Sequence, residues 1–330
     1  MNYEASDLDN LSQQRRYAMT SIAIIAVYIG KLPNWTQLWL KTCANNPGIQ
    51  FFLATDQVDS LTNLPANVAT IPVTLAGLRV RFSELVGFPV ELPVPYKICE
   101  YKPLYGLLFS EYLHGFRYWA HVDMDMLFGN ISNFIPWNSI EQYDRLFHRG
   151  HFALFRNTDA GNNLFRLPHP DFPLERFFCN PRYMGFDETI GMIRIVEHNK
   201  ISQFENNEVI GDLTHRSPRM ALTHKSLNFR HQAFAIHNGR AIHIYDNQGK
   251  IETREFMYFH FQKRFYPPSA FQEFNTVSDI LITPHGLVPG REEPWTVKRL
   301  KNINKPNYSH LANRYLKVGK KILANLFESR

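Results

Sequence analysis

Short apolar runs alternate with amphipathic segments along the first 120 residues of the chain. Residues 21–29, 49–56 and 67–73 are rich in β-branched and aromatic side chains, which predicts three buried strands. Residues 35–43 and a segment beginning at Phe82 place apolar side chains at helical spacing. This β-α-β order with short connections predicts an α/β fold, with a mainly parallel central sheet flanked by helices.

The next predicted helix and strand lead to two acids in an apolar setting. A helix is predicted over residues 103–115, with Pro103 in its first turn. The strand predicted over 116–122 then runs directly into Asp123 and Asp125. Burying a carboxylate costs several kcal/mol unless it is paired or bound to a cation, so both acids need a positive partner. They are expected at the carboxyl end of a central strand, where open α/β sheets bind ligands.

A divalent metal ion is the partner that this spacing favours. Residues i and i+2 of a strand point to the same side, so Asp123 and Asp125 can face one site. Mg²⁺ and Mn²⁺ prefer carboxylate oxygens, and such an ion can neutralise a phosphate leaving group. The same spacing at Asp7 and Asp9 lies in a polar segment with no strand before it, and is interpreted as solvated. A helix cap or a salt bridge is the alternative at 123–125.

The second half of the chain is less regular. Residues 150–157 predict a strand, and residues 234–245 predict a hairpin whose Asn238-Gly239 pair suits a type I′ turn. Another strand is predicted over residues 255–265. The sequence shows no internal repeat and no low-complexity segment.

Composition limits the classes of protein. With 330 residues, 44% of them hydrophobic, the chain can bury a sizeable core. Three widely spaced cysteines predict neither a disulfide framework nor a zinc site, and fit a reducing compartment. No apolar run is long enough to span a membrane. The apolar run after Arg15-Arg16 lacks a small-residue cleavage site, which favours a strand over a signal peptide and predicts a cytoplasmic location.

The charge is concentrated at the carboxyl end. Residues 296–330 contain nine lysines and arginines against one acid, Glu328, which more than accounts for the net charge of +6. Residues 309–327 predict an amphipathic basic helix, suited to an anionic membrane surface or packed on the body with its lysines in water. The tail has few aromatic residues for base stacking, so no nucleic-acid partner is expected. The predicted domains are an N-terminal extension (1–20), one α/β domain (21–295) and this basic helical tail (296–330).

Four sequence motifs resemble a known group of enzymes. They are YIGKLPNWTQLWLKTCANNPGIQFFLATD, YKPLYGLLFSEYLHGFRYWAHVDMDMLFGNI, GFDETIG and YFHFQKR. Together they resemble the nucleotide-sugar glycosyltransferases of the GT-A type, in which a D-x-D motif follows a core strand of a Rossmann-like sheet. More narrowly, they resemble a bacterial family found among surface-polysaccharide enzymes and mostly described as a domain of unknown function.

The resemblance implies an activity and a metal site. The activity is transfer of a sugar from a nucleotide-diphosphate donor, with a UDP-sugar favoured, to a saccharide or lipid-linked saccharide of a capsule or lipopolysaccharide. The implied cofactor is Mn²⁺ or Mg²⁺, with Asp125 as a direct ligand. Asp123 is implied at the metal or the ribose, and His260 is implied to complete the metal site.

The resemblance also implies contacts with the nucleotide. Asp56 is expected at the nucleobase or ribose, Lys102 near the nucleotide, and Lys263 and Arg264 at the diphosphate. Each assignment has a plainer alternative. Asp56 suits ordinary turn chemistry, His260 suits a half-buried strand position, and the three cations suit a solvated surface.

The group that takes the acceptor's proton is expected in residues 185–191. An inverting transferase needs a carboxylate as general base, whereas a retaining one does not need it in that position. Glu188 is preferred to Asp187 for this role. Two exposed acids that begin a helix are the alternative.

Two other classes of function fit parts of the sequence. A phosphatase of the haloacid dehalogenase type also places D-x-D after an apolar strand. That motif normally opens its domain, whereas more than a hundred residues precede it here. It also expects a later pair of acids, for which only Asp187 and Glu188 are available. A non-catalytic protein of the same fold that binds a nucleotide or a sugar is the third class.

Overall fold

The computed structural model describes residues 22–262, 264, 266, 279–290 and 293–316. Within these ranges the chain forms two compact units. The first contains residues up to 124 and residues 134–207, and the second contains residues 125–133 and those from 208 onward. The chain therefore passes from one unit to the other inside the Asp123–Asp125 triplet. The predicted domain boundaries at 20/21 and 295/296 stay predictions.

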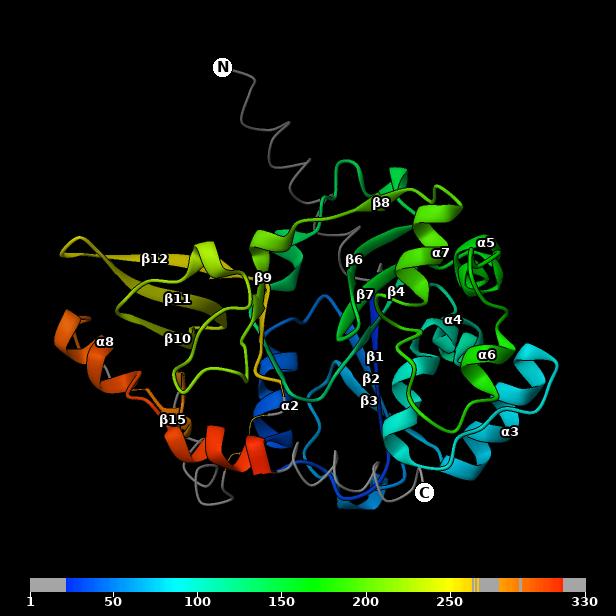
Figure 1. Cartoon of the computed structure of the whole chain (residues 1–330), viewed down its shortest axis with the longest axis horizontal. Helices are drawn as coiled ribbons and strands as arrows, with labels where there is room; N and C mark the ends of the chain where they lie inside the picture. Colours follow the sequence, from blue (N-terminus) through cyan, green and yellow to red (C-terminus); the bar gives the residue numbers. More distant parts are fainter. Residues whose placement is uncertain (1–21, 263, 265, 267–278, 291–292, 317–330) are drawn as a thin grey trace. The chain divides into compact units, whose positions relative to one another are not determined.

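Among the described residues, the first unit is built on a seven-stranded sheet of order β3-β2-β1-β4-β7-β6-β8 (Figure 1). Strands β3, β2, β1 and β4 are parallel, β7 is antiparallel to both β4 and β6, and β8 is parallel to β6. The strands are β1 (Ile22–Tyr28), β2 (Gln50–Thr55), β3 (Val68–Pro72), β4 (Tyr118–Val122), β6 (Arg145–Arg149), β7 (Phe152–Arg156) and β8 (Gln203–Phe204). The prediction of a mixed α/β fold with a parallel-rich sheet is confirmed.

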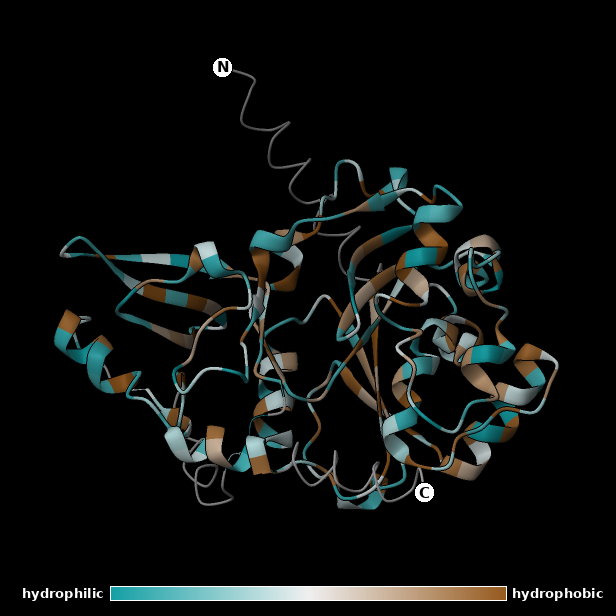
Figure 2. Ribbon diagram, in the orientation of Figure 1, coloured by the Kyte–Doolittle hydropathy of each residue, from teal (hydrophilic) through white to brown (hydrophobic). Residues whose placement is uncertain are grey.

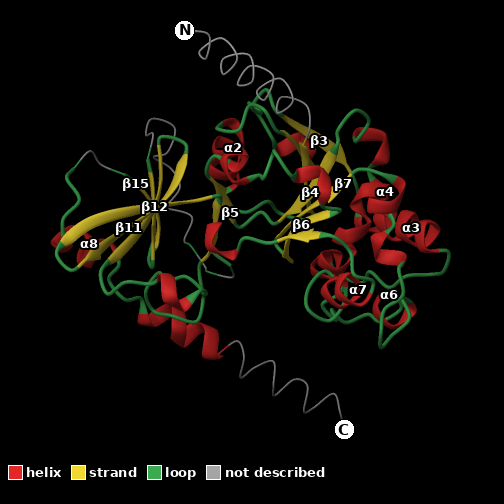
Figure 3. Ribbon diagram, turned by 90° about the horizontal axis from the view of Figure 1, so that it is seen from above, coloured by secondary structure: helices red, strands yellow, loops and turns green. Residues whose placement is uncertain are grey.

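Helices cover both faces of this sheet (Figure 3). On one face, Ile25 and Phe52 belong to a core completed by α3, α4, α6 and α7. On the other face, the ring of Trp39 in α2 meets the ring of Phe51 edge-on at 6.0 Å. The central strands are accordingly hydrophobic along most of their length (Figure 2). The helices are α2 (Thr36–Ala44), α3 (Leu75–Val86), α4 (Tyr105–Leu108), α5 (Asp159–Asn162), α6 (Glu175–Phe178) and α7 (Met192–His198).

The helix predicted over 103–115 is mostly absent, and that prediction was wrong. A 3₁₀ helix covers Pro95–Leu104, and the α-helical part is limited to the four residues of α4. Pro103 lies inside the 3₁₀ segment, where its missing N–H disfavours α-helical bonding. Side chains three residues apart are eclipsed in a 3₁₀ helix, which lets Lys97 and Glu100 form an ion pair.

That ion pair is buried and joins two segments of the first unit. Lys97 and Glu100 are 1% and 0% exposed. The ammonium of Lys97 donates to Glu100 and to the carbonyl oxygens of Phe177 and Arg182, at 2.9 and 2.8 Å. Glu100 Oε1 accepts the backbone N–H of Met184. The segment that leads to Lys102 is thereby fixed to the segment that leads to Asp187.

The second unit contains two further sheets among its described residues. One is antiparallel with the order β12-β11-β10-β14-β15, and the other has the order β5-β13-β9. Its helix α8 (Val297–Ile303) packs Leu300 against β10 and β11. The strands are β5 (Met126–Phe128), β9 (Ile210–Asp212), β10 (Gln232–His237), β11 (Arg240–Asn247), β12 (Lys250–Phe256), β13 (Tyr258–His260), β14 (Ile280–Thr283) and β15 (Gly286–Pro289).

The predicted hairpin is confirmed. Asn238 and Gly239 join β10 to β11 with φ values of +48° and +74°, as a type I′ turn requires. The strand predicted over 255–265 is instead divided between β12 and β13, with Met257 separating them.

Only part of the predicted basic tail falls within the described residues. After α8, residues 308–316 are helical, and the side chain of Asn307 caps this segment by accepting the backbone N–H of His310 at 3.1 Å. Residues 317–330 lie outside the described ranges. No helix in the described part of the chain is both long and apolar enough to cross a membrane.

The buried pair makes a testable prediction about stability. Lys97→Met leaves the Glu100 carboxylate buried without its partner, so we expect the free energy of unfolding to fall by about 3–5 kcal/mol. Lys97→Met/Glu100→Gln removes both charges and keeps an oxygen for the Met184 N–H, so it should recover at least half of that loss. Denaturant unfolding measures both values. A double variant no more stable than the single one would refute the electrostatic explanation.

Candidate functional site

Asp123 follows β4, and a buried lysine meets its charge. The ammonium of Lys102 donates to Asp123 Oδ1 and, at 2.7 Å, to the carbonyl oxygen of Gly150. Asp187 Oδ2 lies 3.8 Å from the same nitrogen. The backbone N–H of Asp123 donates to the carbonyl of His151 at 3.2 Å, which fixes the strand end. The structure therefore brings together three of the predicted site residues, namely Asp123, Lys102 and Asp187.

Two of these three groups, Lys102 and Asp187, have pKa values shifted from their ordinary values. Burial alone would lower the pKa of Lys102, but Asp123 and the other nearby acids outweigh it and hold that pKa well above its ordinary value. Burial raises the pKa of Asp187 to about 7, against the opposing effect of Lys102. Tyr183 donates its hydroxyl to Asp187 Oδ1 at 2.9 Å. Lys102 thus stays charged on Asp123, while Asp187 changes protonation near neutral pH.

Asp187 and Glu188 have different surroundings although they are adjacent in the chain. Asp187 is 1% exposed, whereas Glu188 is exposed. The Glu188 side chain lies against Gly150, where an added Cβ would come within 2.4 Å of Glu188 Oε1. Gly150 is the same residue whose carbonyl accepts from Lys102. Of these two acids, Glu188 is therefore the one that faces solvent beside the cluster of Asp123, Lys102 and Asp187, here called the Asp123 cluster. The role of either acid as a base stays a prediction.

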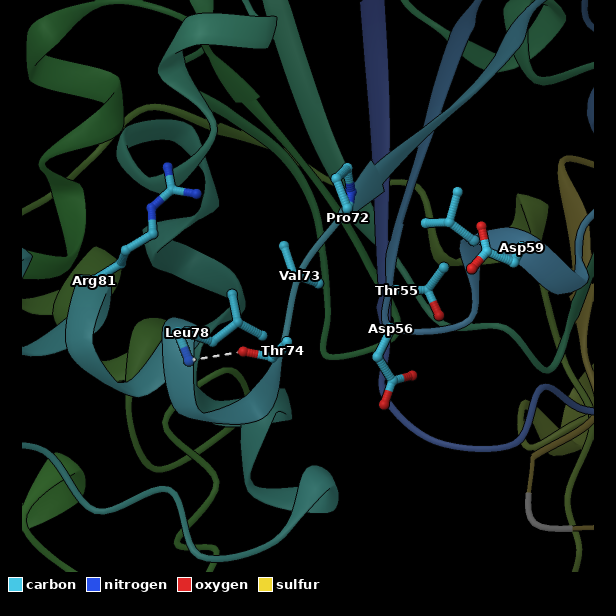
Figure 4. Close-up of a pocket in the computed structure, with 10 residues that line it drawn as sticks. Thr55, Asp56, Asp59, Pro72, Val73, Thr74, Leu78 and Arg81 are labelled. Carbon is cyan, nitrogen blue, oxygen red and sulfur yellow. Dashed lines mark hydrogen bonds between the residues drawn. The ribbon is translucent and has the colours of Figure 1, made fainter.

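Asp56 follows β2 beside an open cavity. The backbone N–H of Gly30, which comes after β1, donates to Asp56 Oδ1 at 2.9 Å. Gly30 has a φ of +94°, a conformation that favours glycine. A cavity of about 530 Å³ lies at the ends of β2 and β3, with Asp56, Asp59, Thr74 and Arg81 among its lining residues (Figure 4). The acids on its wall can accept hydrogen bonds from neutral groups such as hydroxyls.

A residue that the sequence analysis missed fixes the backbone between the two acids. Trp35, directly before α2, donates its indole N–H to the carbonyl of Met124 at 2.7 Å across 89 residues of sequence. Met124 is the middle residue of the Asp123–Asp125 triplet. A tryptophan at the predicted start of a helix was the available signal, because its large ring needs packing partners and its N–H needs an acceptor.

In the second unit, Asp125 directly precedes β5, the first strand in sequence of the three-stranded sheet β5-β13-β9. Strand β5 pairs antiparallel with β13, and the N–H of Phe261 donates to the carbonyl of Asp125 at 3.1 Å, extending that pairing. His260 ends β13, and its Nε2 lies 3.3 Å from Asp125 Oδ1. The structure thus brings together two of the three predicted metal ligands, Asp125 and His260. The third, Asp123, precedes Asp125 by two residues.

The imidazole of His260 lies between two carboxylates. It is 8% exposed, and its Nδ1 lies 2.8 Å from Asp212 Oδ1. Burial alone would lower the pKa of His260, but Asp125 and Asp212 outweigh burial and raise that pKa to about 10. The position therefore favours a positive charge. Asp212 was not predicted from the sequence.

The two cations predicted at a diphosphate are less informative. Lys263 lies outside the described residues. Arg264 is 3% exposed, and its Nη2 donates to the carbonyl oxygens of Thr214, Ser217 and Arg219 at 2.7, 3.0 and 3.1 Å. In the described structure Arg264 therefore holds one loop of the second unit, and its contact with a diphosphate stays a prediction.

A family model matches residues 24–291, and its description is "Family of unknown function (DUF6625)". The chain belongs to this family. The match includes most of β1, all of β4 and all of the candidate site residues. No curated protein matches the sequence.

Among solved structures, one match is the apo-form glycosyltransferase GlyE of Streptococcus pneumoniae TIGR4. The two chains are 10% identical and superpose with a TM-score of 0.34, over 56% of this chain. This chain covers 45% of the GlyE chain, less than half of its length. A likeness of that extent is partial and establishes no shared activity.

The raised pKa of Asp187 predicts a pH dependence of stability. The folded protein holds this proton up to about pH 7, whereas the unfolded chain releases it near 3.8, so folding favours the protonated acid. Its stabilising contribution is therefore complete below pH 3.8 and is lost as the pH rises toward 7. Relative to Asp187→Asn, the wild type should lose about 2 kcal/mol of unfolding free energy between pH 5 and pH 8.

Denaturant unfolding at the two pH values measures this difference. Glu84→Gln is the matched control, because Glu84 is an exposed acid that does not contribute to the pKa of Asp187 and its loss should leave the wild-type pH dependence unchanged. Parallel pH profiles for the wild type and Asp187→Asn would show that Asp187 does not hold a proton in the folded state.

Proposed function

We propose that this protein is a metal-dependent glycosyltransferase of the GT-A type. Its donor is a nucleotide-diphosphate sugar, with a UDP-sugar favoured, and its acceptor is a saccharide or a lipid-linked saccharide. The process that it serves is bacterial surface-polysaccharide synthesis, at a cytoplasmic location with peripheral membrane contact through residues 296–330. The sequence motifs support this reading, and the site geometry supports its metal requirement.

One observation carries the proposal. Two acids in D-x-D spacing follow a buried strand of the parallel part of a sheet, and the second acid meets a buried imidazole nitrogen. Neighbouring ligands about 2.1 Å from an octahedral ion lie about 3 Å apart. The 3.3 Å between His260 Nε2 and Asp125 Oδ1 fits that spacing. Carboxylate oxygens suit Mn²⁺, and imidazole is the commonest protein ligand of metal ions, so the residues present fit a divalent metal.

Each residue has a stated role in the proposal. Asp125 and His260 hold the metal, and Asp123 contacts the metal or the ribose. Lys102 orients Asp123 through its charge-assisted hydrogen bond. A bound Mn²⁺ or Mg²⁺ supplies charge neutralisation for the departing diphosphate. Asp56, on the wall of the cavity, accepts hydrogen bonds from the nucleoside.

The diphosphate and the acceptor complete the assignment. Lys263 and Arg264 are proposed at the diphosphate, as basic residues three and four positions after the end of β13. Glu188 is proposed as the base that takes the acceptor's proton if the reaction inverts, because it is the solvent-facing acid beside the Asp123 cluster. Asp187 is the second candidate, and its Oδ2, which lies 3.8 Å from Lys102 Nζ, favours a role in positioning that lysine.

The proposal predicts metal-dependent binding of one nucleotide. Ligand at 100 times its Kd stabilises the folded protein by about 2.7 kcal/mol, so Tm should rise with UDP and Mn²⁺ together. Thermal-shift measurements with UDP, GDP and CMP, each with and without Mn²⁺, compare the donor classes. Asp125→Ala should abolish the shift, because it removes a direct metal ligand.

The control is Asp9→Ala, which alters the chain's other D-x-D triplet and should keep the wild-type shift. Absence of a shift with every nucleotide would contradict the proposal and favour the phosphatase. A nucleotide shift that needs no metal, without sugar transfer, would instead favour a non-catalytic binding protein.

A further inference from the structure

We propose that Asp212 is a positioning residue, whose carboxylate fixes the ring of His260 so that Nε2 is the nitrogen offered to the metal. This inference rests on the proposed function, because it assigns His260 a metal-binding role. It names a residue outside the sequence motifs, brought to the site by strand pairing alone.

The register of two strands places Asp212 beside His260. Strands β9 and β13 are parallel, and Asp212 is the direct partner of His260 across them. Register partners in a parallel pair project their side chains to the same face of the sheet. Asp212 Oδ1 accordingly lies 2.8 Å from His260 Nδ1, while His260 Nε2 lies 3.3 Å from Asp125 Oδ1. Each ring nitrogen of His260 therefore lies beside a different carboxylate, Nδ1 beside Asp212 and Nε2 beside Asp125.

Asp212 is itself held by two further hydrogen bonds. Gln262 Nε2 donates to Oδ1 at 2.8 Å, and the Thr223 hydroxyl donates to Oδ2 at 3.0 Å. An ionised carboxylate accepts hydrogen bonds only, so His260 Nδ1 must be the donor in this contact. Without a metal the charged ring also carries a proton on Nε2, and a metal ion that binds there displaces this proton and takes the Nε2 lone pair beside Asp125. A histidine that ligates a metal through one nitrogen and donates the other N–H to a carboxylate is the arrangement that orients such ligands.

The backbone keeps this pair in register. A Cβ at Gly211 would come within 2.3 Å of the Tyr258 carbonyl oxygen, so only glycine permits the observed approach of β9 to β13. The N–H of Leu213 donates to the carbonyl of His260 at 2.8 Å, and the N–H of Thr223 donates to the carbonyl of Asp212 at 2.8 Å. These bonds fix the backbone of Asp212 and of the residue that follows it.

Binding of Mn²⁺ to the full-length protein, measured by electron paramagnetic resonance of the free ion, tests the inference. Asp212→Asn keeps the size of the side chain and removes its charge, and it should weaken Mn²⁺ binding about 10–100-fold. Thr223→Val is the matched control, because it removes a hydrogen bond to the same carboxylate without touching His260. It should change the Mn²⁺ affinity less than threefold.

Two further variants separate this inference from the proposed function. Asp125→Ala and His260→Ala should abolish Mn²⁺ binding, and unchanged binding in both would overturn the metal site itself. Lost binding in these two, with wild-type affinity in folded Asp212→Asn, would overturn the positioning role alone.

A spectrum of the wild type supports or overturns the inference even if Asp212→Asn does not fold. In protein labelled with ¹⁵N-histidine and saturated with Mg²⁺, the signal that disappears in His260→Gln should carry its proton on Nδ1. A proton on Nε2 of that residue would contradict the assignment.

Discussion

The candidate site depends on how the protein offsets the cost of desolvating two carboxylates, Asp123 and Asp125, at the end of an apolar strand. Such charges cost several kcal/mol to desolvate, and only fixed positive partners or a bound cation offset that cost. The buried ammonium of Lys102 forms an ion pair with Asp123, and the buried imidazole of His260 lies beside Asp125. Each partner is in turn fixed by other residues of its own unit.

This compensation explains features far from the acids. Lys102 needs its 3₁₀ segment to be immobile, and the buried Lys97–Glu100 pair fixes that segment to the backbone near Asp187. His260 needs a fixed ring, and Asp212 supplies it through the register of β9 and β13. In both cases charged residues outside the site hold the segment or the side chain that carries the site's positive group.

The sequence predicted the parts that local patterns determine. The apolar runs of β1, β2, β3 and β4 match the structure closely, as does the hairpin at Asn238-Gly239, because side-chain periodicity and turn chemistry are read within a few residues. The helix expected over 103–115 was wrong because Pro103 disfavours α-helical bonding in this segment. The 3₁₀ segment is also held by contacts of Lys97 and Glu100 with residues 80–85 positions away, which local propensity does not reveal.

The site was predictable only in part for the same reason. Asp123, Asp125 and His260 were found from motifs, whereas Asp212 joins His260 across 48 residues and Trp35 joins Met124 across 89. Such pairings are set by strand register and packing. A weak signal for Asp212 did exist, since it ends a short apolar run, Val209-Ile210-Gly211, as Asp123 ends its own strand.

Anomalous diffraction from crystals grown with Mn²⁺ and UDP tests the central claim most directly. Data collected at the manganese absorption edge locate the ion without reference to activity. The account predicts one strong peak in contact with an Asp125 carboxylate oxygen and with His260 Nε2, with the UDP diphosphate on the same ion. An ordered UDP with no manganese peak at these two residues, or a peak elsewhere in the chain, would contradict it.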